Sequence, residues 1–257
     1  MPGPTLAELK AEGQPPSVTS RLNDEHWAGR LYMRKISPWA TWAFARLGWS
    51  PNAVTAAFIL CGLGAGAVVA IGGLPSAVAA AILIQAYLLF DCADGELARW
   101  SKRTSAGGVY LDGIGHYLGE AALLTGLGVR AQGHLTLSGG YVSAGLAAAL
   151  LAVIVKAETD QVTVARAKAG LPGRHDDAAL RPRSGGLAVL RRGAALLGVH
   201  RIIQAVELSA LILAAAAADA ALGGLAATRV LVIACLAVAA VLALVHPVAI
   251  LASRRLR

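Results

Sequence analysis

Three aspartates and a histidine occur close together in the segment DCADGELARWSKRTSAGGVYLDGIGH, residues 91–116. Asp91 and Asp94 are three residues apart, and Asp112 and His116 are four apart, so each pair would share one face of a helix. The Gly-Gly pair between them predicts a turn. A hairpin of two helices would therefore bring the two polar faces together.

These acids lie in unusually apolar surroundings. Asp91 directly follows a mostly apolar run, and Asp112 lies inside another apolar segment. A carboxylate near the centre of a membrane helix costs about 2.5–3.5 kcal/mol, and the nearby Arg99 cannot neutralise three of them. Clustered carboxylates favour a hard cation, Mg²⁺ or Mn²⁺, and three converging acids suggest one or two ions holding a phosphate ester. The alternative interpretation is a plain solvated helix end.

The composition indicates an all-α integral membrane protein. Of the 257 residues, 56% are hydrophobic and only 15% are charged, whereas about 25% are charged in a typical soluble domain. The apolar residues come in long blocks, and the mean hydropathy is +0.61. A soluble Ala-rich bundle would need polar stripes with a period of about 3.6 residues, and segments 205–218 and 230–245 show almost none.

Hydropathy predicts six transmembrane helices, each near the ~20 residues needed to cross a bilayer. Their expected ranges are 52–73, 75–97, 109–129, 139–162, 196–219 and 228–251. Of the 23 Lys and Arg residues, only Arg130 and Arg229 fall on the side opposite the termini. Because cytoplasmic loops carry the excess of positive charge, both termini and segment 91–116 are predicted to be cytoplasmic. The net charge of +8 then indicates attraction to anionic lipid rather than to nucleic acid.

The N-terminal part divides into two segments. Residues 1–20 are polar and Pro-rich, which predicts a disordered tail rather than a signal peptide. Residues 21–49 hold four of the five Trp residues, and basic residues alternate there with apolar ones. This pattern predicts an amphipathic helix lying in the membrane interface. The six-helix domain, 50–257, is expected to begin with Ser50 as N-cap and Pro51 as first helical residue.

The aspartates belong to a longer gapped pattern, Asp91-x2-Asp94-Gly95-x2-Ala98-Arg99-x8-Gly108-x3-Asp112-x3-His116. This pattern resembles the signature of the CDP-alcohol phosphotransferase family, whose members are also called CDP-alcohol phosphatidyltransferases. The signature has four aspartates, and His116 replaces the fourth one here. Pro51-Asn52-x2-Thr55 also resembles the start of the family's first span. With the amphipathic segment and the six spans, the resemblance covers about residues 25–257.

The resemblance implies an activity. Members of this family transfer a substituted phosphate from a CDP-linked donor to a polar alcohol and release CMP. In the larger bacterial group the donor is CDP-diacylglycerol and the product is a phospholipid, which implies a multi-pass protein of a bacterial plasma membrane. A branch that uses a soluble CDP-alcohol and a lipid acceptor is the alternative within the same chemistry. Homodimers are common in the family, and the Gly- and Ala-rich spans would allow one.

The resemblance also implies roles for single residues. Asp91, Asp94 and Asp112 would be ligands of two divalent ions, Mg²⁺ or Mn²⁺, that hold the CDP diphosphate. The residues expected to line the nucleotide and phosphate pocket are Asn52, Thr55, Gly95, Ala98, Arg99 and Gly108.

His116 is the departure from the family pattern, and three interpretations of it are open. Imidazole is a good base near neutral pH and also binds metals, so His116 is a candidate catalytic base and a candidate metal ligand. Alternatively, it marks a degenerate protein that binds CDP or lipid without turnover. We favour a working enzyme because every other signature position is kept. Glu120, one turn further on the same face, either restores the missing carboxylate or is an unrelated helix charge.

Charged residues within the apolar helices are the candidates for binding the acceptor. Lys156 and Arg201 are predicted, with Glu120, to contact the acceptor, because charges inside a membrane are functional candidates. Alternatively, the two cations reach the interface with their long side chains or pair with nearby acids. A small transporter is the interpretation from a different class. It would show repeats and broken helices at mid-membrane, and neither is visible in the sequence.

Overall fold

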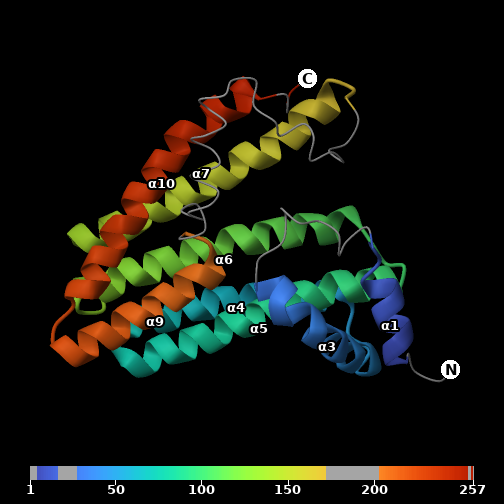
Figure 1. The fold of residues 1–257 in the computed structure, drawn as a ribbon, viewed down its shortest axis with the longest axis horizontal. Coiled ribbons are helices and arrows are strands. Elements are labelled where there is room, and N and C mark those ends of the chain that lie inside the picture. Colours follow the sequence, from blue (N-terminus) through green and yellow to red (C-terminus); the bar gives the residue numbers. More distant parts are fainter. Residues whose placement is uncertain (1–4, 17–27, 172–202, 254–255, 257) are drawn as a thin grey trace.

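The fold is helical throughout the part of the chain that the structure describes. The computed structural model describes residues 5–16, 28–171, 203–253 and 256. Their elements in chain order are α1 (Leu6–Gly13), the π-helical turn η1 (Gly29–Met33), α3 (Arg34–Arg46), α4 (Pro51–Ile71), α5 (Gly73–Trp100), α6 (Ala106–Gln132), α7 (Gly140–Lys168), α9 (Ala205–Leu222) and α10 (Ala226–Ala252). Figure 1 shows that the long helices form one bundle, with α1 and α3 gathered at one end of it.

Five of these helices, α4, α5, α7, α9 and α10, are long and apolar enough to cross a membrane, and the chain is a multi-pass membrane protein. The sixth predicted span, 109–129, lies within α6, which has 27 residues but is not in this set. The reason is its polar residues, Asp112, His116, Glu120 and Arg130. Glu120 and Arg130 are only 4% and 3% exposed, so their charges face neighbouring helices. Five of the six predicted spans are therefore found as candidate membrane helices. Residues 196–202 of the predicted span 196–219 lie outside the described residues, and α9 begins at Ala205.

Local sequence explains where the helices around the acidic segment begin. Ser50 Oγ accepts a hydrogen bond from the Ala53 N–H at 3.2 Å, and Pro51 occupies the first turn of α4, as expected. Ser105 caps α6 in the same way and accepts from the Gly108 N–H at 3.0 Å. Each cap satisfies one of the backbone donors that a helix N-terminus leaves unpaired. The first turns of α4 and α6 are thus fixed.

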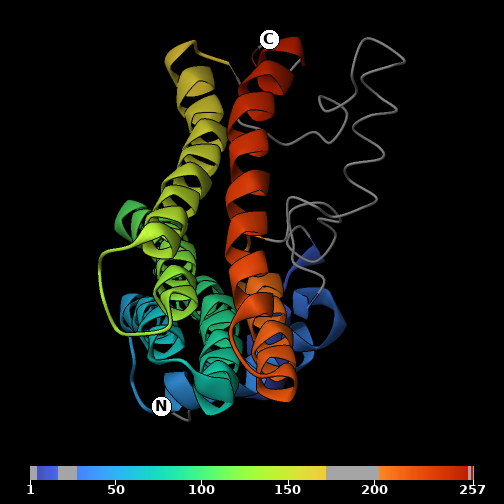
Figure 2. The same ribbon diagram turned by 90° about the vertical axis from the view of Figure 1, so that its left-hand side faces the viewer.

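The helix α4 lies between α5 and α6 and packs against both. Gly66 and Gly126 allow the close approach of α4 to α6: a Cβ atom at Gly126 would lie 2.1 Å from the Gly66 carbonyl oxygen. Small residues permit this kind of packing in membrane bundles. Figures 1 and 2 show α7 and α10 side by side, diverging from α6 toward the end of the bundle where α1 and α3 lie.

Part of the segment predicted as a disordered tail is helical. The helix α1 begins with a capping box, in which Thr5 Oγ1 accepts from the Glu8 N–H and the Glu8 carboxylate accepts from the Thr5 N–H. Leu9 is 1% exposed, and α1 packs against α3 and α5. The composition of the tail did not reveal this helix because its apolar contact is with residues far along the chain.

The predicted interfacial segment 21–49 contains η1 and α3, while its residues 21–27 lie outside the described part. Several of its large apolar side chains are exposed; they include Leu31, Ile36, Trp39, Leu47 and Trp49. An exposed aromatic and aliphatic surface is what an interfacial helix would turn toward lipid. The position of the segment in the interface stays a prediction.

Candidate functional site

The acidic segment forms the end of α5 and the start of α6, as the spacing predicted. Asp91 and Asp94 lie near the C-terminus of α5, and Asp112 and His116 lie in the first turns of α6. The two helices do not pack along their lengths, because α4 lies between them. The acids meet only where the polar faces of α5 and α6 come together.

Three of the four predicted metal ligands form one group, here called the Asp-Asp-His group: Asp91, Asp112 and His116. His116 Nε2 lies 3.2 Å from Asp91 Oδ1 and 3.6 Å from Asp112 Oδ1. One ligand atom from each side chain lies within 4.8 Å of those of the other two. All three side chains remain partly exposed, at 22% for Asp91, 45% for Asp112 and 29% for His116, so a ligand can reach them.

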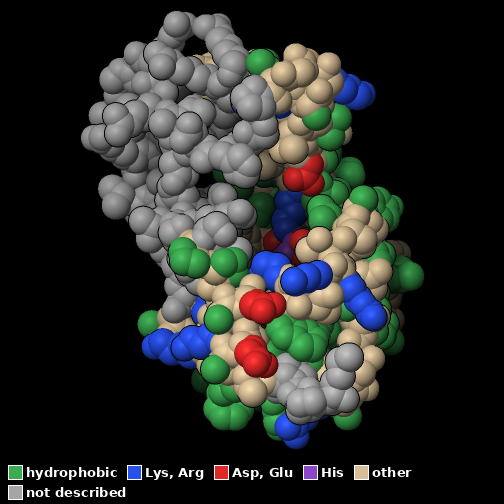
Figure 3. Space-filling view, turned by 90° about the vertical axis from the view of Figure 1, so that its right-hand side faces the viewer, with side chains coloured by type: hydrophobic (Ala, Val, Ile, Leu, Met, Phe, Trp, Pro, Cys, Tyr) green, Lys and Arg blue, Asp and Glu red, His purple; other side chains and the backbone are tan. Residues whose placement is uncertain are grey.

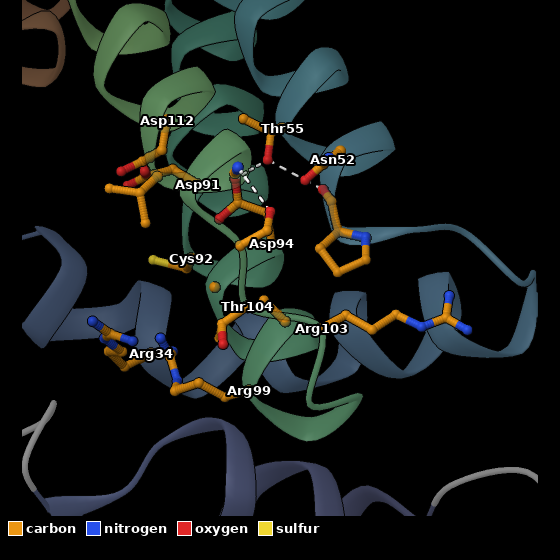
Figure 4. A pocket seen from close by; sticks show the side chains of 16 residues that line it. Arg34, Asn52, Thr55, Asp91, Cys92, Asp94, Arg99, Arg103, Thr104 and Asp112 are labelled. Carbon is orange, nitrogen blue, oxygen red and sulfur yellow. Dashed lines mark hydrogen bonds between the residues drawn. The ribbon is translucent and has the colours of Figure 1, made fainter.

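The fourth predicted ligand, Asp94, lies apart from this group and is 7% exposed. Its Oδ2 accepts a hydrogen bond from Thr55 Oγ1 at 2.6 Å, and Thr55 Oγ1 also lies 3.1 Å from the Pro51 carbonyl oxygen. Thr55 is the fifth residue of α4, so this contact joins the N-terminal part of α4 to α5. Figure 4 shows Asp91 and Asp112 facing each other while Asp94 points toward Thr55.

The imidazole of His116 is held from its other side. Its Nδ1 lies 3.0 Å from the hydroxyl oxygen of Tyr87, which is 2% exposed, and its ring packs edge-on against Phe58. These contacts direct Nε2 toward the two carboxylates. The sequence analysis did not select Tyr87, although its spacing of four residues before Asp91 places both on one face of α5.

A cavity of about 350 Å³, here called the first cavity, opens beside these residues. All six residues predicted for the nucleotide and phosphate pocket line it, namely Asn52, Thr55, Gly95, Ala98, Arg99 and Gly108. Asp91, Asp94 and Asp112 line it as well. Its further lining residues, which the sequence analysis did not select for the site, are Arg34, Pro51, Cys92, Arg103, Thr104, Ser105 and Val109.

A second cavity, of about 510 Å³, lies between α6, α7 and α10 and shares Asp112 with the first. Two predicted acceptor residues line it and form an ion pair, with Lys156 Nζ 3.0 Å from Glu120 Oε1. Tyr117 donates a hydrogen bond to Asp160 in the same cavity. Figure 3 looks at this end of the bundle and shows a hollow with acidic, basic and histidine side chains within it.

The predicted acceptor residue Arg201 lies outside the described residues. The described residues nearest to it in sequence, Ile203 and Gln204, line the second cavity. His246 on α10 also lines this cavity, and its Nδ1 lies 3.0 Å from a carboxylate oxygen of Glu158 on α7. The second cavity thus contains paired polar side chains from helices that are distant in sequence.

The sequence model of the CDP-alcohol phosphatidyltransferase family matches residues 49–254. The chain belongs to this family. A search of curated proteins finds no match. Membership makes the chain an enzyme of the CDP-alcohol phosphotransferase type, which acts on a CDP-linked donor and an alcohol acceptor. The matched region begins at Trp49, so α1, η1 and α3 precede the part that defines this CDP-alcohol phosphatidyltransferase.

Enzymes of this family use divalent metal ions, and the Asp-Asp-His group fits such an ion. Two carboxylates and one imidazole, drawn from two helices, place their ligand atoms within 4.8 Å of one another. Carboxylate oxygen suits Mg²⁺ and Mn²⁺, and imidazole suits transition metals. The exposed fractions of the three side chains leave room for phosphate oxygens or water as further ligands. This CDP-alcohol phosphatidyltransferase therefore has a candidate metal site at the border of its two cavities.

Proposed function

We propose that the enzyme transfers a phosphatidyl group from CDP-diacylglycerol to a polar alcohol and releases CMP, as a step of phospholipid synthesis. The observation that carries the proposal is the position of the Asp-Asp-His group. It borders the first cavity, lined by the signature residues, and Asp112 also lines the second cavity. A donor and an acceptor held in the two cavities would meet at these side chains.

In this proposal Asp91, Asp94 and Asp112 hold two divalent ions, Mg²⁺ or Mn²⁺. Ions held by these carboxylates would neutralise the diphosphate and polarise the phosphoryl group that is transferred. The CDP part lies in the first cavity, where Gly95 and Ala98 leave space beside α5 and Arg99 provides positive charge. Asn52 and Thr55 provide polar contacts from α4, and Gly108 keeps the start of α6 close: a Cβ atom there would lie 3.3 Å from Asn52 Oδ1.

The acceptor occupies the second cavity beside Glu120 and Lys156. Its hydroxyl oxygen forms a bond to the phosphorus as the bond to the oxygen of CMP breaks, and its proton passes to His116 Nε2. The hydroxyl of Tyr87 at Nδ1 keeps the ring turned for this step. A neutral imidazole is a suitable acceptor for a proton near neutral pH. His116 thereby performs the role of the base, in place of the fourth signature aspartate.

We further propose that α6 crosses the membrane as the sixth span and that both termini and both cavities face the cytoplasm of a bacterial cell. The buried positions of Glu120 and Arg130 support a crossing α6, because these charges are covered by protein. A cysteine introduced at Thr104 in a cysteine-free background tests the orientation. A membrane-impermeant maleimide should label it in inverted vesicles and leave it unlabelled in intact cells, and the reverse pattern would contradict the proposed orientation.

The activity is tested with purified protein, Mg²⁺ or Mn²⁺, labelled CDP-diacylglycerol and a panel of polar alcohols. The expected result is CMP release that requires one of the alcohols and the metal. Activity only with a soluble CDP-alcohol and a lipid acceptor would assign the enzyme to the alternative branch. Tight CDP binding without turnover on any acceptor would show a degenerate protein and refute the proposal.

A further inference from the structure

We infer that Glu96 is a positioning residue for the donor nucleotide, because it joins the N-terminal elements to α5 and thereby holds Arg34 and Arg99 at the first cavity. The inference rests on the proposed function insofar as the first cavity is the CDP site. Glu96 occupies an unassigned position inside the signature, directly after Gly95. Residues two apart on a helix point to nearly opposite sides, so Glu96 faces away from the side on which Asp94 lies.

Glu96 is a buried carboxylate that is saturated with donors. It is 1% exposed. Its Oε1 accepts from Ser37 Oγ at 2.5 Å and from Gln14 Nε2 at 2.8 Å, and its Oε2 accepts from Thr41 Oγ1 at 2.7 Å. Ser37 and Thr41 belong to α3, and Gln14 directly follows α1. A buried charge is tolerated only with such partners, so this arrangement couples α1 and α3 firmly to α5.

The first consequence concerns Arg99, which lies three residues after Glu96 and lines the first cavity. Its Nε donates a hydrogen bond to the Gly13 carbonyl oxygen at 2.7 Å. Gly13 is the last residue of α1, where helix carbonyls carry partial negative charge that attracts a guanidinium. A Cβ atom at Gly13 would lie 3.1 Å from Glu96 Cβ, so the glycine favours this close approach of the end of α1 to α5.

The orientation of Arg99 follows from a second contact. Its guanidinium lies over Gly95, where a Cβ atom would be 3.1 Å from Nη1. The hydrogen bond from Nε to Gly13 therefore fixes the inner part of the Arg99 guanidinium. Its terminal nitrogens lie along α5 beside the first cavity. A guanidinium held in one orientation loses less freedom when it binds a phosphate. The contact with α1 thus holds the Arg99 guanidinium in an orientation suited to binding the anionic donor.

The second consequence concerns Arg34, the first residue of α3. Its Nη1 lies 3.9 Å from Glu96 Oε1, and its side chain lines the first cavity. Gln14 Nε2 also donates to the Arg34 carbonyl oxygen at 2.8 Å. Figure 4 shows Arg34 and Arg99 on the same side of the cavity, although they come from different elements. One buried acid therefore orients two cations toward the proposed diphosphate site.

The residues that Glu96 binds all precede the region that the family model matches, which begins at residue 49. The signature explains Arg99 but not its contact with α1, and it contains no position for Arg34. The donor cavity of this chain is completed by N-terminal residues that Glu96 holds in place.

The test measures CDP affinity in the presence of Mn²⁺ for the full-length protein and for Glu96→Gln, which keeps the shape of the side chain and removes its charge. We expect the Kd for CDP and the KM for the donor to rise about tenfold, with kcat changed less than about twofold. Gln14→Ala, a milder change, should raise the same Kd about threefold. Asp219→Asn is the matched control, because it removes a buried carboxylate at the opposite end of the bundle and should leave the Kd unchanged.

A double-mutant cycle separates positioning from mere folding. In an Arg34→Ala/Arg99→Ala background, Glu96→Gln should weaken CDP binding less than about twofold further, because its targets are gone. Fully additive losses, or a Glu96→Gln protein that melts earlier while binding CDP normally, would overturn the inference. If the wild type binds CDP but transfers nothing, the proposed function fails while these affinities still decide the role of Glu96. A wild type that binds no CDP overturns both.

Discussion

The charged side chains at the two ends of the bundle are paired in different ways. At one end Asp219 accepts from the Ala227 N–H at 2.8 Å, from the Thr228 N–H at 3.1 Å and from Thr228 Oγ1 at 2.5 Å. Arg130 lies beside them, with Nε 3.4 Å from Thr228 Oγ1 and Nη1 2.9 Å from the Gly73 carbonyl oxygen. These residues, here called the Arg130 cluster, satisfy one another and join the ends of four helices.

At the other end the acids are left facing one another. Asp91 and Asp112 both lie close to the imidazole of His116, and Asp112 lines both cavities. Neither of these cavities is lined by a residue of the Arg130 cluster. Neighbouring carboxylates favour a positively charged ligand between them, which agrees with the proposed metal site. The closed cluster is therefore expected to contribute to stability, and the open one to the proposed binding and chemistry.

The largest expected effect is at the open end. Asp112→Asn should lower the rate of CMP release about 1,000-fold, because it removes a metal ligand at the border of both cavities. The melting temperature without metal should stay the same or rise, since one of two facing acids is neutralised. Parallel measurements of CMP release and thermal unfolding check both expectations. A large loss of stability would show that Asp112 is structural and that the comparison is wrong.

The closed end should respond in the opposite way. Asp219→Ala should destabilise the protein by about 3 kcal/mol, because it leaves buried donors and the charge of Arg130 without their partner. The activity per folded molecule should be unchanged. Thermal unfolding in detergent, followed by an assay of the folded fraction, measures the two quantities separately. Loss of activity without loss of stability would remove the distinction between the two ends.

The helix faces of the acidic segment followed from spacing in the sequence. Intervals of three and four residues predicted the shared faces of Asp91 with Asp94 and of Asp112 with His116. The same reasoning could not separate Asp94 from the group, because its distance from Asp112 depends on the packing of α4 and on its contact with Thr55. Residue spacing predicts which side chains share one face of a helix. How the faces of α5 and α6 meet depends on the packing of α4 between them.

The remaining misses are long-range contacts. Arg34 lies beside Glu96, Gln14 donates to Glu96, and the Gly13 carbonyl oxygen accepts from Arg99. Each of these contacts spans more than fifty residues of sequence, so no local pattern predicts it. The capping box at Thr5 and Glu8 is a signal for α1 in the sequence, but the prediction for residues 1–20 rested on their polar, Pro-rich composition alone. The helix α6, which contains the predicted span 109–129, differs from the five candidate spans in its polar residues: Glu120 and Arg130 lower its mean hydropathy, although packing buries both side chains.

A third change sharpens the role of the histidine. His116→Ala should lower turnover about 100-fold, the range expected for the loss of a general base, with CDP affinity nearly unchanged. His116→Asp should keep measurable activity, because it restores the family's fourth aspartate. Initial rates and CDP binding at several Mn²⁺ concentrations separate the two roles. A shift of the metal requirement to higher concentration, with normal turnover at saturation, would make His116 a ligand instead of a base.

The smallest expected effect tests how His116 is held. Tyr87→Phe removes the hydroxyl 3.0 Å from Nδ1 and keeps the packing of the ring against Phe58. Loss of one hydrogen bond, about 1 kcal/mol, should lower kcat about fivefold and leave the KM for the donor unchanged. Steady-state kinetics with the preferred acceptor provide the check. An unchanged kcat would show that the ring is positioned by packing alone.

The central claim is that the acids at the open end bind the CDP donor through divalent metal, and titration calorimetry with CDP tests it most directly. The wild type and Asp219→Asn should bind CDP when Mn²⁺ or Mg²⁺ is present and should lose this binding when the metal is chelated. Asp112→Asn should bind CDP weakly under both conditions. Equal CDP affinity in all three proteins, with or without metal, would contradict the account.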